Sequence, residues 1–235
     1  MLGMSQLRRI KRGWVRKSRP ADWRSLRNLD PVSRSFGLDR GIPVDRYYIE
    51  KFLAAKADRI TGAVLEIAES TYSRKFGHDV SSFEVLHTRH APKVTMVGDL
   101  TDPESLPDGR IDCFICTQTF NFIYDFKSAI RGAFQLLRPG GVLLATLGGI
   151  SQISRFDMDR WGDYWRFTTL SAEKAFSEVF GPQQVQVASE GNVLAATAFL
   201  QGIASEELTP EELDHPDDDY QLLITVVAQK PSQCP

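Results

Sequence analysis

The sequence predicts an α/β fold in which a doubly wound, mostly parallel sheet is covered by helices on both faces. Short and almost wholly apolar segments, bounded by glycine and polar loops, recur along the chain. Amphipathic helical segments alternate with them, which is the pattern of buried parallel strands joined by crossover helices. The chain has 235 residues, of which 42% are hydrophobic and 25% charged. It is therefore long enough to bury an ordinary core without disulfides or metals.

The expected strands, in order, are Val64–Ile67, Val80–Leu86, Lys93–Leu100, Ile111–Thr117, Gly141–Leu147, Val185–Ser189 and Leu222–Lys230. A helix over Asp45–Lys56 precedes them. A second helix, Asp125–Leu137, carries its apolar residues on one face, with Asp125 as a plausible N-cap. Residues 138–141, Arg-Pro-Gly-Gly, should stop that helix and turn the chain. A third helix is expected over Ser171–Phe180, with Ser171 as its N-cap.

Charge is distributed unevenly along the chain. The first 30 residues hold nine Lys or Arg and two Asp, whereas residues 206–219 hold eight acids and no Lys or Arg. We divide the chain into a basic arm, 1–41, and a domain, 42–235. Three interpretations are open. Both charged segments are solvated surface, the two segments approach each other, or the arm contacts an anionic surface such as a membrane. The net charge of −2 argues against a dedicated nucleic-acid binder.

Other features point to a cytoplasmic protein. No apolar run is long enough for a transmembrane helix, which needs about 18 residues. The N-terminus has no apolar stretch of the kind found in secretory signals. Three cysteines do not make a disulfide framework. The pair Cys113 and Cys116 has the spacing of a redox or zinc site, but it falls inside an apolar strand and is expected to be buried core. No spacing typical of a metal site occurs, so no metal is expected.

Acidic residues stand at or near the ends of three successive strands: Glu66, Glu84 and Asp99. The carboxyl ends of parallel strands form the ligand-binding edge of such sheets. Carboxylates there can accept hydrogen bonds from ribose hydroxyls or an adenine amino group. The alternative interpretation is that these acids only cap helices or face solvent.

These acids, together with GDLTD at Gly98–Asp102 and the block Asp112–Thr146 that contains LLRPGG, carry a resemblance. From Ile42 to Lys230 the chain resembles class I S-adenosylmethionine-dependent methyltransferases, most closely the type 11 group. The segments Gly37–Leu53 and Ser151–Ser171 resemble a subgroup found beside bacterial glycosyltransferases, which suggests a sugar or glycan hydroxyl as acceptor. The resemblance implies a Rossmann-like sheet of seven strands with the last strand antiparallel.

The resemblance also implies a cofactor site for S-adenosylmethionine. Glu66 would lie near the methionyl amine or order the loop, and Glu84 would accept from the ribose. Asp99 and Leu100 would hold the adenine, while Thr117 and Gln118 would face the sulfonium. The remaining cofactor-binding candidates, Ala68, Ser70 and Thr71, belong to the loop after the first strand.

That loop departs from the family pattern, because Ala68, Ser70 and Tyr72 stand where three glycines are usual. Either the pocket is rebuilt, with Ser70 or Thr71 capping a helix whose N-terminus faces the cofactor, or the chain is a catalytically silent module that binds a partner enzyme. An oxidoreductase is a further alternative. A Tyr72 or Glu69 side chain that filled the cavity would exclude the cofactor.

The acceptor is expected at the insertion after the fifth strand, residues 150–168. Aromatic rings stack on sugar faces, and Arg binds anionic groups. The substrate candidates are Arg155, Trp161, Tyr164 and Arg166, and the candidate bases are Asp157 and Asp159. The alternative is that the aromatic residues pin a lid to the core while the charged residues are solvated.

Overall fold

The computed structural model describes residues 27–232. Most of the basic arm, residues 1–26, lies outside the described residues. The predicted contact between the arm and an anionic surface therefore stays a prediction. Residues 32–232 belong to one compact unit. No helix among the described residues is both long and apolar enough to cross a membrane.

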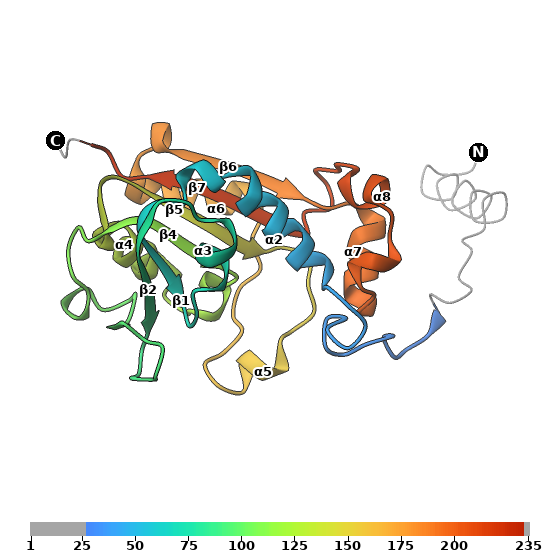
Figure 1. Ribbon diagram of the computed structural model, residues 1–235. Helices are drawn as coiled ribbons and strands as arrows, with labels where there is room; N and C mark the ends of the chain where they lie inside the picture. The colour runs from blue at the N-terminus through green and yellow to red at the C-terminus, as the bar shows by residue number, and fades with distance from the viewer. Residues whose placement is uncertain (1–26, 233–235) are drawn as a thin grey trace, which may run out of the picture. The chain divides into compact units, whose positions relative to one another are not determined.

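The sheet has seven strands in the order β3-β2-β1-β4-β5-β7-β6 (Figure 1). Its strands are β1 (Gly62–Ile67), β2 (Val80–His87), β3 (Met96–Val97), β4 (Ile111–Thr117), β5 (Leu137–Gly148), β6 (Val185–Glu190) and β7 (Leu223–Gln229). Strands β1 to β5 pair in parallel, whereas β7 runs antiparallel to both β5 and β6. The predicted doubly wound, mostly parallel sheet with an antiparallel last strand is confirmed.

Helices cover both faces of the sheet (Figure 1). The helices are α2 (Val44–Ala55), α3 (Thr71–Phe76), α4 (Phe126–Leu136), α5 (Arg155–Met158), α6 (Thr169–Phe180), α7 (Val193–Gln201) and α8 (Pro210–Asp214). Buried residues of α4 and α6 pack on one face, and those of α2 and α7 pack on the other. The short helix α5 sits on a loop that extends away from the sheet (Figure 1).

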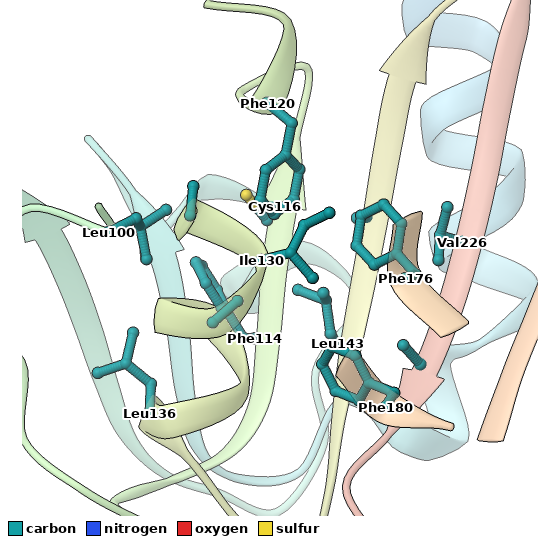
Figure 2. Close-up of a cluster of buried hydrophobic side chains, with 14 of the residues drawn as sticks. Leu100, Phe114, Cys116, Phe120, Ile130, Leu136, Leu143, Phe176, Phe180 and Val226 are labelled. Carbon is teal, nitrogen blue, oxygen red and sulfur yellow. The ribbon is translucent and has the colours of Figure 1, made fainter. Parts of the chain in front are cut away.

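Strand β4 supplies both cores, because successive side chains of a strand point to opposite faces. Phe114 and Cys116 join the core under α4 and α6, which Figure 2 shows with Phe176 among its members. Cys113 belongs to the core under α2 and α7. The two cysteines are thus buried on opposite faces and form no paired site, as expected. Burial raises the pKa of Cys116 to about 12, so this thiol is inert at neutral pH.

Two strand boundaries differ from the prediction. Strand β3 is limited to Met96–Val97. Just before it, the Thr95 hydroxyl accepts the Val85 N–H at 2.8 Å, and just beyond its end the Asp99 N–H donates to the Ser105 hydroxyl at 2.9 Å, so side chains take up these hydrogen bonds. Strand β5 begins at Leu137, directly after α4 ends. The Arg-Pro-Gly-Gly segment does stop the helix, but it continues as extended chain with left-handed Gly140 (φ 83°) rather than as a separate turn.

The helix caps were predicted in part. Asp125 caps α4 by accepting the Ser128 N–H at 3.0 Å, as expected. The prediction of Ser171 as the N-cap of α6 is wrong: Thr168 is the N-cap, and Ser171 is its partner in a reciprocal capping box. Helices α7 and α8, between β6 and β7, were not predicted from the sequence.

Candidate functional site

A cavity of about 660 Å³ opens at the carboxyl ends of β1, β2 and β4, beside the loop after β3. This is the edge at which doubly wound sheets bind ligands. Of the residues selected from the sequence, the following line the cavity: Glu66, Ala68, Asp99, Leu100, Thr117, Gln118, Asp157, Trp161 and Tyr164. Ser70, Thr71, Glu84, Arg155, Asp159 and Arg166 do not line it.

Glu66, at the end of β1, is 4% exposed and holds the start of α3. Its carboxylate accepts the Tyr72 N–H at 3.1 Å, the Ser73 N–H at 2.7 Å and the Ser73 hydroxyl at 2.5 Å. Burial raises the pKa of Glu66, and the hydrogen bonds from Ser73 and Tyr72 oppose this shift. The acid therefore orders the loop, which is one of the two roles expected for it.

The expectation that Ser70 or Thr71 caps α3 is not met. Ser70 occupies the N-cap position without a side-chain cap hydrogen bond, and its hydroxyl instead accepts from Arg74 Nε at 3.0 Å. Since Glu66 already takes two of the first N–H groups of this six-residue helix, they do not face the cavity as free donors.

Ala68 keeps the backbone conformation that glycine usually provides. Its φ is 67°, in the left-handed region, and its N–H donates to the Leu86 carbonyl at 3.1 Å. An L-residue in this region costs about 1–2 kcal/mol relative to its ordinary conformations. The loop thus retains the shape of a glycine loop at its first position, with a methyl group added to the cavity wall.

Glu84 does not reach the cavity, because β2 continues beyond it. Glu84 pairs in register with Leu65 inside the sheet, and the strand ends three residues later at His87. The cavity wall at this strand is formed by Leu86, His87 and Thr88. The predicted strand, Val80–Leu86, already ran past Glu84, and its apolar residues Val85 and Leu86 indicated that Glu84 lies before the strand end.

Asp99 and Leu100 follow β3 and form one wall of the cavity. Asp99 Oδ1 accepts both the N–H and the hydroxyl of Thr101 at 2.8 Å, which fixes a tight turn. Leu100 is 4% exposed and joins the core under α4. Gly132 of α4 allows this close approach, since a Cβ there would lie 2.2 Å from the Leu100 carbonyl oxygen.

Thr117 and Gln118 come from the end of β4, as expected. Gln118 has a left-handed φ of 47°, an uncommon conformation for a residue other than glycine. Its N–H donates to the Thr146 carbonyl at 2.9 Å, so β5 holds this strained residue in place. Strained backbone of this kind clusters at ligand-binding sites.

The insertion 150–168 divides into residues that face the cavity and residues that do not. Trp161 and Tyr164 line it, and the ring of Tyr164 packs edge-on against Tyr124, with centroids 5.4 Å apart. Arg155 and Asp159 pair with each other at 3.3 Å, with side chains 72% and 61% exposed, and do not line the cavity. Asp159 is thus not placed to act as a base.

Asp157 lies at the cavity but is occupied by local hydrogen bonds. Its two oxygens accept from the Ser154 hydroxyl at 2.5 Å and from Trp161 Nε1 at 3.1 Å. Asp157 therefore holds helix α5 and its tryptophan together. Arg166 forms a bidentate ion pair with Asp163, at 2.5 and 2.9 Å, beside a second cavity of about 170 Å³. This smaller cavity was not predicted from the sequence.

The comparisons with known proteins agree with this geometry. Residues 60–145 match the family model described as "Methyltransferase domain". The structure is similar to that of the [4+2]-cyclase SpnF, with a TM-score of 0.53 and 13% identity over 88% of each chain. It is also similar to an S-adenosylmethionine-dependent methyltransferase from Mesorhizobium loti, with a TM-score of 0.50 and 16% identity over 83% of this chain and all of that one.

The chain has the class I methyltransferase fold. No curated protein sequence matches it. Because the structural identities are low, these similarities establish the fold alone. The matched segment, 60–145, contains the strands β1 to β4 that build the large cavity, and the remainder of the methyltransferase fold adds the insertion that borders it.

Proposed function

We propose that this protein is an S-adenosylmethionine-dependent methyltransferase that acts on a small molecule. The observation that carries the proposal is the open cavity of about 660 Å³ at the carboxyl edge of the sheet. Its volume lies within the range of roughly 300–1,000 Å³ that cofactor sites occupy. Tyr72 and Glu69 line this cavity together with Asp99, so neither side chain closes the space beside Asp99.

The residues of the cavity fit the proposed cofactor. Asp99 and Leu100 would hold the adenine end, because Asp99 offers carboxylate oxygens next to an apolar wall. His87 and Thr88 replace Glu84 as the groups at the end of β2. Thr117 and Gln118, with Ala68 opposite in the loop after β1, would enclose the methionyl end.

The cofactor supplies a methyl group that its sulfonium has already activated for displacement. The protein's task is then to orient the acceptor and to exclude water. Trp161, Tyr164 and Tyr124 form an aromatic border in the lining of the cavity, which suits the faces of a sugar ring. Together with the resemblance of Ser151–Ser171 to the glycosyltransferase-associated subgroup, this border supports a sugar or glycan hydroxyl as the acceptor.

Thermal shift and calorimetry with S-adenosylmethionine and S-adenosylhomocysteine test the proposal. Ligand present at 100 times its dissociation constant stabilises a folded protein by about 2.7 kcal/mol. We expect both ligands to raise the melting temperature and NAD to leave it unchanged. No shift at millimolar ligand would favour the silent module that binds a partner enzyme, and a shift with NAD alone would favour an oxidoreductase.

A further inference from the structure

The smaller cavity, of about 170 Å³, adjoins the proposed cofactor cavity. Gln118, Phe122 and Asp157 line both of them, so the two spaces meet at the end of β4. This is the end at which the proposed function places the sulfonium. A group held in the smaller cavity would therefore lie next to the methyl group to be transferred.

Charged and polar side chains line part of the smaller cavity, and most of its charges are already neutralised or engaged. Asp163, whose side chain is 1% exposed, forms the ion pair with Arg166 and also accepts the Ser154 N–H at 2.9 Å. Asp157 is held by Ser154 and Trp161. Amide groups complete the wall, contributed by Gln118, Asn121 and Gln152.

Asp45 is the remaining carboxylate of the wall, and no motif in the sequence marks it as a site residue. It lies half-buried in the first turn of α2, far from the insertion in the chain but across the same small cavity. Among the described residues, its carboxylate accepts a hydrogen bond from the backbone N–H of the adjacent Arg46, at 2.8 Å. It thus retains the capacity to accept a proton from a group placed in the cavity.

We propose that the smaller cavity binds the reacting hydroxyl of a neutral, polyhydroxylated acceptor, and that Asp45 is the catalytic base that receives its proton. This inference rests on the proposed function. The acceptor oxygen forms a bond to the methyl carbon while the carbon–sulfur bond breaks, and the electron pair of that bond goes to sulfur. The hydroxyl proton goes to the Asp45 carboxylate, so the products are the methyl ether, the thioether and a protonated Asp45.

The charges of the cavity select against anionic acceptors. Asp45, Asp157 and Asp163 face Arg166, which leaves an excess of negative charge even after the ion pair is counted. The amides and the Ser154 hydroxyl offer hydrogen bonds that suit neutral hydroxyl groups. The aromatic border of Tyr124, Trp161 and Tyr164 is within the adjoining cavity and can carry the rest of a sugar.

The proton affinity of Asp45 agrees with the role of a base. Burial raises the pKa of Asp45 to about 6, and the neighbouring Arg46 opposes the shift. A base with such a pKa is deprotonated at neutral pH yet accepts a proton readily. The titratable and charged groups around it are Arg46 on its own helix, Tyr72 of α3, and Asp157, Asp163 and Arg166 of the insertion.

The test compares Asp45→Asn with Asp58→Asn, which removes an exposed carboxylate that lines neither cavity. Calorimetry first measures S-adenosylhomocysteine binding to each protein. Tritiated methyl transfer is then measured with neutral methyl glycosides of glucose, mannose and rhamnose, and with glucuronate as the anionic counterpart. Saturation-transfer NMR, with S-adenosylhomocysteine bound, reports glycoside contact without turnover.

We expect Asp45→Asn to bind S-adenosylhomocysteine within about twofold of the wild type but to lose about 100-fold or more of the transfer rate. Asp58→Asn should match the wild type. The wild-type rate should fall as pH decreases through the pKa of Asp45, and glycoside contact should persist in both variants.

Three results would overturn the inference while leaving the proposed function intact. They are an undiminished rate in Asp45→Asn, transfer to glucuronate in preference to the glycosides, and cofactor binding without transfer to or contact with any glycoside. A wild-type protein that fails to bind S-adenosylhomocysteine would instead overturn the proposed function itself.

Discussion

Ser73 donates two hydrogen bonds to the buried carboxylate of Glu66, one from its backbone N–H at 2.7 Å and one from its hydroxyl at 2.5 Å. Tyr72 adds a third from its N–H at 3.1 Å. The acid at the end of β1 thus replaces a capping side chain for α3. This arrangement explains how the loop keeps its shape although its second and third glycine positions hold Ser70 and Tyr72.

Replacing Glu66 with Gln should destabilise the protein by about 1–3 kcal/mol. The amide nitrogen of Gln is a donor, and it would face a backbone or hydroxyl donor of Tyr72 or Ser73 in a buried position. Urea denaturation of the purified variant measures the change in the free energy of unfolding.

The matched control for this prediction is Glu69→Gln. Glu69 is an exposed acid of the same loop, so its neutralisation should change stability by less than about 0.5 kcal/mol. Equal effects of the two substitutions would show that the loss comes from the charge of the loop and not from the cap of α3.

Replacing Ala68 with Gly should stabilise the protein, by about 0.5–1 kcal/mol. Relief of the left-handed strain at φ 67° is worth about 1–2 kcal/mol, and the greater chain entropy of unfolded Gly offsets part of it. The control is Ala54→Gly, at an exposed position in the last turn of helix α2, which should destabilise by up to about 1 kcal/mol. If denaturation curves showed that both substitutions change the free energy of unfolding in the same direction, they would contradict the strain at Ala68.

Much of the fold was accessible from the sequence, because buried parallel strands are almost continuous apolar runs. Strand β4 was predicted at its observed bounds for this reason. Helix α7 was missed because it is apolar on most of its surface and lacks the stripe that identifies an amphipathic helix. Strand β3 was too long in the prediction, since the hydroxyls of Thr95 and Ser105 accept backbone N–H groups at its two ends, which sequence patterns do not reveal.

The large cavity was predicted better than the identity of each residue in it. Asp99 and Gln118 follow strand ends that the sequence marks clearly. Glu84 was expected to reach the cofactor, but it lies three residues before the end of β2 and does not line the cavity. Asp45 was not selected because its helix reaches the site only through the folding of the chain. Residues that are far apart in the chain, such as Asp45 and the insertion, can be predicted to meet only if the topology is known. A single sequence indicates the fold class but not these contacts.

Neutralising Glu207 should lower stability in a pH-dependent way. Hydrogen bonding from Arg40, at 2.6 and 2.8 Å, lowers the pKa of Glu207 to about 2, below the ordinary value near 4.3. Because the folded-state pKa is depressed, the stabilisation is complete above about pH 5 and is lost as pH falls towards 2. The difference in melting temperature between the wild type and Glu207→Gln should therefore shrink over this window.

The control for this ion pair is Glu211→Gln, an exposed acid of the same segment for which no ion pair occurs among the described residues. Its melting temperature should follow that of the wild type at every pH. A constant gap between wild type and Glu207→Gln from pH 7 to pH 3 would contradict the role of the Arg40 pair.

Replacing Gly132 with Ala should destabilise the protein by about 1–3 kcal/mol, because the new methyl group would overlap the Leu100 carbonyl, 2.2 Å away. At a helical position with free space, replacing Gly with Ala stabilises a protein by about 1 kcal/mol. The sign of the change in the free energy of unfolding therefore tests the contact. Displacement of Leu100 should also weaken S-adenosylhomocysteine binding in calorimetry. A more stable variant would show that the contact between α4 and the cavity wall is loose.

Asp99→Asn should weaken S-adenosylhomocysteine binding by about 1–3 kcal/mol, because a charge-assisted acceptor is lost from the cavity wall. The Asn oxygen can still accept from Thr101, so the turn that Asp99 forms should persist. The matched control is Glu84→Gln, which removes a carboxylate from the neighbouring strand outside the cavity and should leave the affinity within about 0.5 kcal/mol of the wild type. Calorimetry measures the affinity of both variants. A loss of affinity in Glu84→Gln with none in Asp99→Asn would contradict the assignment of the nucleoside to the cavity wall at Asp99.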